Sequence, residues 1–387
     1  MGDFMIKLRD KTLLLLSFLG ATAFSLIGLV TYKENRISQG TGYSSFEFLG
    51  GFAIIILVLW IVLIGLSFYN GKNKNILVFS LSSILLIALF WTLQKVTLEY
   101  VGGNSSARIS LSGGFYIQIF SLYMLLSFYS ARIKKYKFVK WLGLAAIVSF
   151  LVYSFASGAF DDLSLVKEYN IKRDQFYESL RIHALLTLSS VLTGAIIAIP
   201  LGFLAYTKKR WEDRVMVPLS IIQTVPSLSL FGILLVPLSG LGELGFFEAI
   251  GVSGIGWAPA YVALTLYTLL PIGRNTLTGF YSVDRNIIEA SKGMGMNRKQ
   301  ILSKIELPLA FPVIFTGIRI AFIQTIGGAV LAGLVGGGGM GTFIFLGLGE
   351  ASPDLILLGV LPIVFFTSLL DYILRSIEKA MRGVVYD

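Results

Sequence analysis

The stretch EASKGMGMNRKQILSKIELP, residues 289–308, is a polar insert in a chain that is otherwise mostly apolar. It carries four Lys or Arg and two Glu. Apolar runs of membrane-spanning length flank it, near 258–280 and 309–335. Because a helix needs about 20 apolar residues to cross about 30 Å of hydrocarbon, we expect the insert to project from the membrane surface between two spans.

The composition of the whole chain indicates a membrane protein. Of its 387 residues, 55% are hydrophobic and 14% are charged, which is too apolar for a water-soluble domain of this size. The fold class is therefore predicted to be an all-α membrane protein with about ten transmembrane helices. The apolar windows lie near 12–31, 48–68, 75–93, 114–130, 140–159, 183–206, 215–239, 258–280, 309–335 and 354–374.

The distribution of Lys and Arg predicts how these spans are oriented. With the N-terminus inside, 23 of the 32 basic residues fall on the cytoplasmic side and eight outside, and Arg319 lies within a span. Since such an excess marks cytoplasmic loops, we expect a multi-pass protein of the cell (inner) membrane with both termini cytoplasmic. These loops account for the net charge of +10, so no nucleic-acid partner is expected. The first span resembles a signal peptide but is longer than a usual signal core, and we expect it to be retained.

The composition of the chain changes near its midpoint, because all ten prolines lie at or after Pro200. Residues 1–160 are interpreted as an N-terminal module of about five plain transmembrane helices, and residues 161–177 as an external linker, a solvated connector rather than an interfacial helix. In residues 178–387 the helices are interrupted by Pro and Gly. Broken helices leave backbone groups that protein or a water-filled cavity must satisfy, so they gather around pathways. We therefore expect the second module to be the functional half of the chain.

The insert has the signals of two short helices separated by a break. Asp284 is placed to cap the first helix, and Gly293 and Gly295 to end it. Asn297 and Gln300 approximate a capping box for the second helix. Five apolar side chains are expected to supply contacts within the pair: Ile287, Ile288, Ile301, Leu302 and Ile305. Residues 281–308 are therefore predicted to form a cytoplasmic knob, with Pro308 marking the re-entry into the membrane.

Seven residues of the insert follow a spaced pattern: Glu289, Ala290, Ser291, Gly295, Ile305, Leu307 and Pro308. They resemble the EAA loop of ABC importer permeases, which reads Glu-Ala-Ala, three residues, Gly, nine residues, Ile-x-Leu-Pro; here Ser291 replaces the second Ala. In that family the loop inserts into a cleft of the cytoplasmic ATPase and transmits its closure to the membrane helices. The resemblance implies that these seven residues couple the chain to an ATPase.

Four further stretches resemble the permeases of osmoprotectant importers, which carry glycine betaine, choline, carnitine and related quaternary amines. They are HALLTLSSVLTGAIIAIPLGFLAY (183–206), IIQTVPSLSLFGILLVPL (221–238), LYTLLPIGRNTLTGF (266–280) and GIRIAFIQTIGGAVLAGLVGGGGMG (317–341). The resemblance covers 178–387 and implies the five-helix core of a type I ABC importer. An extended form with extra N-terminal helices is implied for the whole chain.

Several alternative functions stay open on the residues alone. Permeases for another small solute, such as an amino acid, share the same core. A stand-alone channel or secondary transporter is less favoured, because neither in-membrane acids nor inverted repeats are evident. A membrane enzyme is also disfavoured, because Asp161, Asp162 and Glu168 form only a sparse external group.

Energy and solute capture are expected to come from other polypeptides. The chain has no G-x-x-x-x-G-K-[ST] loop, no cysteine and a single histidine, His183, so no catalytic or metal site is expected. The run GGGGMG at 336–341 is interpreted as a flexible external turn. The resemblance implies cytoplasmic ABC ATPase subunits that bind ATP and Mg, and a second permease subunit in a homo- or heterodimer. A separate extracytoplasmic solute-binding protein is also expected, since the chain ends at Asp387 soon after its last span.

Two places are candidates for the translocation pathway or its gate. Pro226 interrupts span seven, where Gln223, Thr224 and Ser227 are placed to satisfy freed backbone groups or line a cavity.

The second place is Arg319, roughly 16 Å along a helix from Pro308. A buried Arg costs about 2.5 to 3.5 kcal/mol on insertion scales, and it would repel a cationic solute. A structural or gating role is therefore expected, with backbone carbonyls, Gln324 or the partner subunit as its partner.

Overall fold

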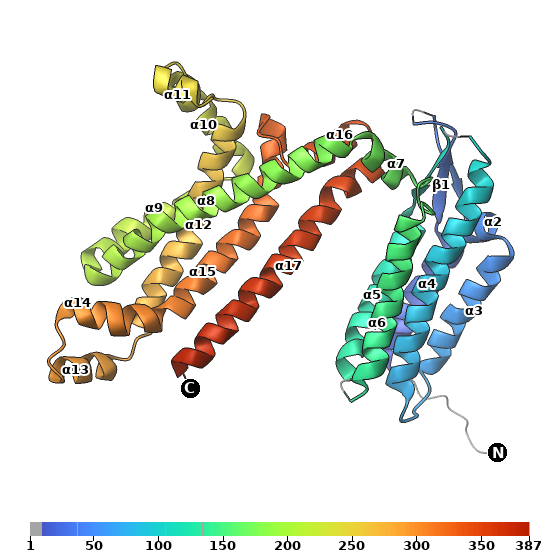
Figure 1. Ribbon diagram of the computed structural model, residues 1–387, viewed down its shortest axis with the longest axis horizontal. Coiled ribbons are helices and arrows are strands. Elements are labelled where there is room, and N and C mark those ends of the chain that lie inside the picture. Colours follow the sequence, from blue (N-terminus) through green and yellow to red (C-terminus); the bar gives the residue numbers. More distant parts are fainter. Residues whose placement is uncertain (1–9, 37, 105, 134, 387) are drawn as a thin grey trace. The chain divides into compact units, whose positions relative to one another are not determined.

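The computed structural model describes residues 10–36, 38–104, 106–133 and 135–386. The chain divides into two compact units, Met1–Ile171 (unit 1) and Lys172–Asp387 (unit 2). Figure 1 shows both units as bundles built mainly of helices. The predicted helical class is therefore confirmed, and each unit is described separately below.

Unit 1 combines helices with a small sheet. Its elements are α1 (Lys11–Leu26), β1 (Val30–Lys33), β2 (Thr41–Tyr43), α2 (Ser45–Leu49), α3 (Gly51–Leu66), α4 (Lys74–Val101), β3 (Arg108–Leu111), α5 (Gly113–Arg132), α6 (Lys137–Ala156) and α7 (Ser164–Ile171). The sheet is antiparallel in the order β2-β1-β3, and Thr31 lies opposite Gly42 on one side and Ser110 on the other. This sheet was not predicted from the sequence, because its strands are only three or four residues long.

The core of unit 1 lies between α1, α3, α4 and α5. Trp60 of α3 is fully buried, and its ring occupies the space that a Cβ on Gly20 of α1 would need. The Trp60 indole nitrogen donates to the Gln118 side chain of α5, 3.4 Å away. Because lipid tails are as apolar as these side chains, close packing of this kind stabilises the unit through van der Waals contact between the helices.

Residues 161–171, expected in a solvated linker, instead pack within unit 1. Leu163 forms a parallel bridge with Ile109, and α7 follows directly. Glu168 of α7 is only 2% exposed and accepts hydrogen bonds from Arg108 Nη1 at 2.7 Å and Arg36 Nε at 2.8 Å. A charged residue can be buried in this way because it is paired with opposite charge.

We expect Glu168→Ala to destabilise unit 1 by about 3 kcal/mol, because it leaves the buried Arg108 guanidinium without its carboxylate. Thermal unfolding of the purified protein in detergent measures the change. Glu99→Ala, which removes an exposed carboxylate from α4, is the matched control and should unfold like the wild type. Equal melting temperatures for Glu168→Ala and Glu99→Ala would contradict the assignment.

Unit 2 begins with the long helix α8 (Arg173–Thr207) and ends with α17 (Pro353–Tyr386). Between them lie the 3-10 turn η1 (Lys209–Trp211), α9 (Glu212–Thr224), α10 (Ser227–Gly242), α11 (Gly245–Ala249), α12 (Trp257–Tyr281), α13 (Arg285–Gly293), α14 (Arg298–Ile301), the π-turn η2 (Leu302–Glu306), α15 (Leu307–Gly328), the 3-10 segment η3 (Ala329–Val335) and α16 (Gly341–Gly349). The helix α12 packs against both α8 and α15 and is the centre of the unit.

Small residues allow α12 to approach its neighbours closely. A Cβ on Gly317 of α15 would lie 2.6 Å from Asn275 Cβ and 2.8 Å from the Pro271 carbonyl oxygen, both on α12. Small residues at helix contacts are typical of membrane bundles, where backbones must come close to gain van der Waals contact. The contact between α12 and α15 therefore depends on glycine at position 317.

Six helices of the described residues are long and apolar enough to cross a membrane, and a bent pair brings the number to seven. The six are Lys74–Val101, Gly113–Arg132, Lys137–Ala156, Arg173–Thr207, Arg298–Val335 and Pro353–Met381. The helices α1 and α3 are apolar but only 16 residues long. The predicted count of ten spans is therefore not confirmed, although an apolar helix lies in most of the predicted windows.

The predicted seventh span, 215–239, is not one helix. Instead, α9 and α10 meet at an angle of 105°. Val225, between them, has an extended backbone with ψ 127°. Proline forces this conformation on the residue before it and cannot donate a backbone hydrogen bond. Pro226 therefore ends α9, and the chain changes direction there.

The glycine run at 336–341 is a packed turn within unit 2, although the sequence suggested a flexible one. Gly336 and Gly339 have φ of +75° and +83°, a region that favours glycine. The Gly256 N–H donates to the Val335 carbonyl at 2.7 Å, and a Cβ on Gly339 would lie 3.3 Å from the His183 ring. The glycines thus let this turn lie against α8 and the start of α12.

Candidate coupling loop and pathway residues

The polar insert folds locally as its capping signals predict. Asp284 Oδ1 accepts a hydrogen bond from the Asn286 N–H at 2.9 Å at the start of α13. Asn297 and Gln300 form a reciprocal capping box at the start of α14, with bonds of 2.8 and 2.9 Å. Gly295 has φ +82° in the turn between the helices. Both predicted helix starts are confirmed.

The second helix does not stop before the membrane span. It runs without a break from α14 through the π-turn into α15, although Pro308 was expected to mark a separate re-entry. The Leu307 N–H bonds to the Leu302 carbonyl, five residues back. Pro308 has no N–H to donate, so it removes one backbone hydrogen bond from this continuous helix. The insert is therefore continuous with α15.

The seven residues of the EAA-like pattern lie at different depths. Glu289, Ala290, Gly295 and Leu307 are exposed, whereas Ser291 is 1% exposed and its hydroxyl donates to the Ile287 carbonyl at 2.7 Å. Pro308 is exposed, and Ile305 is partly buried. Contrary to expectation, the Ile287 side chain is not internal. It is 43% exposed, because Ile288 on the adjacent face of α13 faces the core.

A cavity of about 330 Å³ lies between α13, α14, the π-turn η2 and the ends of α8 and α12. Glu289 and Lys292 line it from α13, and Tyr206 and Glu306 line it from the other helices. Glu306 is 1% exposed and accepts hydrogen bonds from the Tyr206 hydroxyl at 3.0 Å and from Arg298 Nη1 at 2.7 Å. Glu306 could not be singled out from the sequence, because the EAA pattern leaves its position unspecified.

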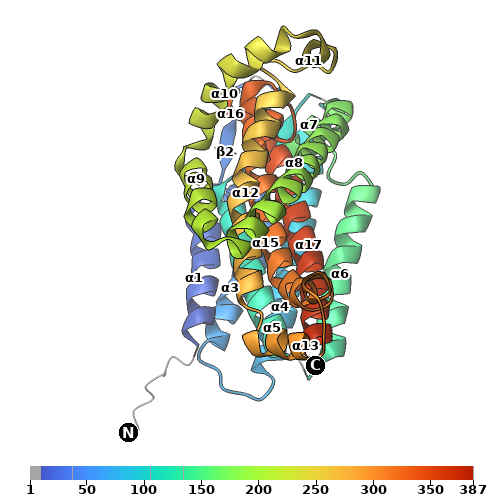
Figure 2. The ribbon, with the colours of Figure 1, turned by 90° about the vertical axis from the view of Figure 1, so that its left-hand side faces the viewer.

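Both views of the molecule place α13 at the same end of unit 2 as the C-terminal end of α17 (Figures 1 and 2). The junction of α8 and α9 lies at this end too, because the Tyr281 hydroxyl of α12 donates to Glu212 of α9 at 2.9 Å. The basic residues of 208–214, of the insert and of the end of α17 therefore share one end of the unit. This distribution agrees with the grouping on which the cytoplasmic orientation was predicted.

The four pathway candidates around Pro226 gather at the break between α9 and α10. The Gln223 amide donates to the Tyr267 carbonyl of α12 at 3.2 Å. The Thr224 hydroxyl donates to the Ile221 carbonyl at 2.7 Å, and Ser227 is the first residue of α10.

The Tyr267 hydroxyl in turn donates to the Val225 carbonyl at 2.6 Å. Tyr267 therefore satisfies the broken backbone from a second helix. The role of Tyr267 could not be predicted, since no sequence motif links α12 to the break at Pro226.

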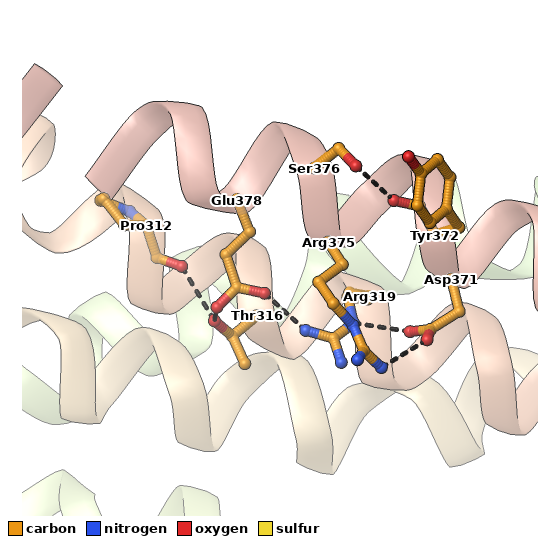
Figure 3. A network of polar contacts seen from close by, with 8 residues as sticks. All are labelled: Pro312, Thr316, Arg319, Asp371, Tyr372, Arg375, Ser376 and Glu378. Carbon is orange, nitrogen blue, oxygen red and sulfur yellow. Dashed lines mark hydrogen bonds and ion pairs between the residues drawn. The ribbon is translucent and has the colours of Figure 1, made fainter. Parts of the chain in front are cut away.

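Arg319 belongs to an ionic network between α15 and α17 (Figure 3). Its guanidinium donates to Asp371 at 2.9 Å and to Glu378 at 2.6 Å. Arg375 also binds Asp371, at 2.6 Å, and the Thr316 hydroxyl lies 2.9 Å from Glu378. Two arginines and two carboxylates balance in charge, which lowers the cost of placing them beside apolar helices.

Two expectations about the membrane region are corrected by this network. Arg319 pairs with acids of α17 and not with Gln324, whose side chain is exposed. The last helix contains acidic residues, although the sequence suggested that the membrane spans have none. The spacing of positions 371, 375 and 378 places them on one helix face, and this was the available signal.

Comparison with known proteins gives two matched regions. Residues 192–383 match the family described as binding-protein-dependent transport system inner membrane component. Residues 9–166 match the family described as ABC transporter permease YehY, N-terminal domain.

Individual relatives are also permeases. The choline transport system permease protein OpuBB of Bacillus subtilis (strain 168) is 39% identical over 199 residues, which cover 51% of this chain and 85% of the relative. The glycine betaine/carnitine/choline transport system permease protein OpuCB of the same organism is 39% identical over 197 residues, covering 51% and 84%. A chain of the MetNI methionine ABC transporter, in an inward-facing conformation, is 23% identical with a TM-score of 0.47, and the match covers 54% of this chain and 97% of that one.

Proposed function

Because this chain belongs to the binding-protein-dependent inner-membrane permeases of ABC importers, in an extended form with a YehY-type N-terminal domain, we propose that it forms the translocation pathway of an ATP-driven importer for osmoprotectant quaternary amines. The carried solutes are of the glycine betaine or choline class. The similar permeases named for choline and glycine betaine transport support this solute class. The alternative is another small solute, such as an amino acid.

The observation that carries the proposal is the continuous helix from the polar insert into α15. Glu289, Ala290 and Gly295 lie exposed on a loop that is followed by uninterrupted helix from Arg298 to Val335. A push on this loop by a cytoplasmic ATPase is therefore delivered along a helix that continues into a membrane span. ATP and Mg bind the ATPase partner in this proposal, and the permease chain performs no catalysis.

Alternating access follows from the same arrangement. Two permease subunits, identical or different, line a pathway at their shared interface, and a separate extracytoplasmic binding protein delivers the solute. The solute and ATP must favour different states of the permease, because a ligand shifts an equilibrium only by its differential affinity. The α9–α10 break at Pro226 offers polar groups for the pathway, and the Arg319 network joins α15 to α17.

Reconstitution tests this proposal. We expect the full chain to co-purify with a cytoplasmic ABC ATPase. Proteoliposomes that contain this ATPase and the binding protein should accumulate betaine or choline only when ATP is present. Carnitine and amino acids complete the solute panel. Uptake of an amino acid alone would show that the solute class is an amino acid and not a quaternary amine. Uptake without ATP or an ATPase would refute the importer mechanism.

A further inference from the structure

We propose that Glu306 is a positioning residue that braces the coupling loop against α8 and α15, so that movement of the loop is transmitted to both helices. This inference rests on the proposed function and adds a residue that the EAA pattern leaves unspecified. Glu306 is the last residue of the π-turn between α14 and α15. Its carboxylate is 1% exposed, and it receives hydrogen bonds from Arg298 of α14 and from Tyr206 of α8.

The π-turn is the weakest point of the connection from the loop to α15. A π-turn has one residue more than an α-turn, and insertions of this kind often mark functional sites and kinks. Pro308 also removes a backbone hydrogen bond in the turn that follows. Without further contacts, a force on α13 and α14 would bend the helix here instead of moving α15.

Two hydrogen bonds to Glu306 oppose this bending. Arg298 of α14 lies eight residues before Glu306, and their bond of 2.7 Å closes over the π-turn. Tyr206, near the C-terminus of α8, donates to the other carboxylate oxygen at 3.0 Å. Charge-assisted bonds to a buried carboxylate are among the stronger hydrogen bonds in proteins. Glu306 thus ties the loop, the start of α15 and the end of α8 together.

The same loop base contains a natural control. Tyr281 of α12 donates to Glu212 of α9 at 2.9 Å, which is also a tyrosine–glutamate bond, but this one is exposed and does not involve the π-turn. Tyr281→Phe therefore removes a similar bond at the same end of unit 2. It should leave the transmission of loop movement unchanged.

The test uses the full chain, which has no native cysteine. Spin labels are attached to two introduced cysteines, Met294→Cys in the loop and Lys208→Cys after α8. The distribution of distances between the two labels is measured in detergent, without partner proteins. We expect a narrow distance distribution in the labelled protein that keeps Glu306 and in its Tyr281→Phe variant. We expect a broad distribution in the Glu306→Gln and Tyr206→Phe variants. Identical distributions in all backgrounds would overturn the brace, whether or not an ATPase binds.

A second readout separates transmission from simple folding. In proteoliposomes with the ATPase and binding protein, we expect Glu306→Gln to lower the solute imported per ATP hydrolysed by about fivefold or more, the lower range of typical coupling effects. Hydrolysis itself should continue. An equal loss of uptake and hydrolysis would give Glu306 a merely structural role and overturn the proposal. Failure of the wild-type chain to import at all would instead refute the proposed function, and the distance measurement would still decide the brace.

Discussion

Gly295→Val is expected to lower ATP-driven uptake at least about tenfold while the protein still inserts and folds, because a β-branched residue resists the left-handed backbone found there. Gly295 has φ +82°, and its N–H closes the turn by donating to the Lys292 carbonyl at 2.9 Å. Placing an L-residue in this region costs about 1 to 2 kcal/mol. The turn therefore rearranges, and α13 is no longer presented to the ATPase at the same angle.

Gly293→Val is the matched control for this effect. An added Cβ meets no heavy atom within 4 Å at either glycine, and only Gly295 has a positive φ. The two variants thus differ in backbone strain and not in crowding. Uptake should stay within about twofold of wild type in Gly293→Val, since exposed helix positions tolerate substitution. Equal uptake by the two variants would show that the turn conformation does not matter for coupling.

Arg319→Ala is expected to destabilise unit 2 by about 3 kcal/mol, because it leaves Asp371 and Glu378 facing apolar helices with part of their neutralising charge removed. The side chains of these two acids are only 23% and 10% exposed. Thermal unfolding in detergent measures the loss, and uptake should fall with it. The triple variant Arg319→Gln, Asp371→Asn, Glu378→Gln removes charge on both sides and should recover most of the stability.

Arg375→Ala is the control within the same network. Its side chain is 59% exposed and forms an i,i+4 pair with Asp371, so its removal should cost no more than about 0.5 kcal/mol. If Arg319→Ala and Arg375→Ala unfold alike, the network is a surface feature and does not hold α15 to α17.

Much of the candidate coupling loop could be predicted because its determinants are local. The Asp284 cap and the capping box of Asn297 and Gln300 join residues two or three positions apart. The left-handed turn at Gly295 depends on the conformational freedom of a single residue. The break at Pro226 also has a local cause, because proline lacks an N–H and restricts the residue before it. Proline alone does not decide where a helix ends, since Pro200, Pro218, Pro237, Pro271, Pro312 and Pro362 lie inside helices.

The sheet of unit 1 and the placement of 161–171 were missed for the opposite reason. The pairing of β1 with β3 joins residues far apart in the chain, and strands this short carry little pattern of their own. The polarity of α7 suggested a solvated connector. Glu168 of α7 is instead buried and paired with Arg108, which lies 60 residues away in the chain.

The sequence by itself therefore determined the membrane class, the grouping of positive charge, and the caps and turn of the coupling loop, because each depends on composition or on neighbouring residues. Only the tertiary structure decided the charge partners. Arg319 meets Asp371 across 52 positions, and Tyr206 meets Glu306 across 100. Such pairs depend on how helices pack against one another. The spacing of residues along one helix does not show which side chains of a neighbouring helix they will meet.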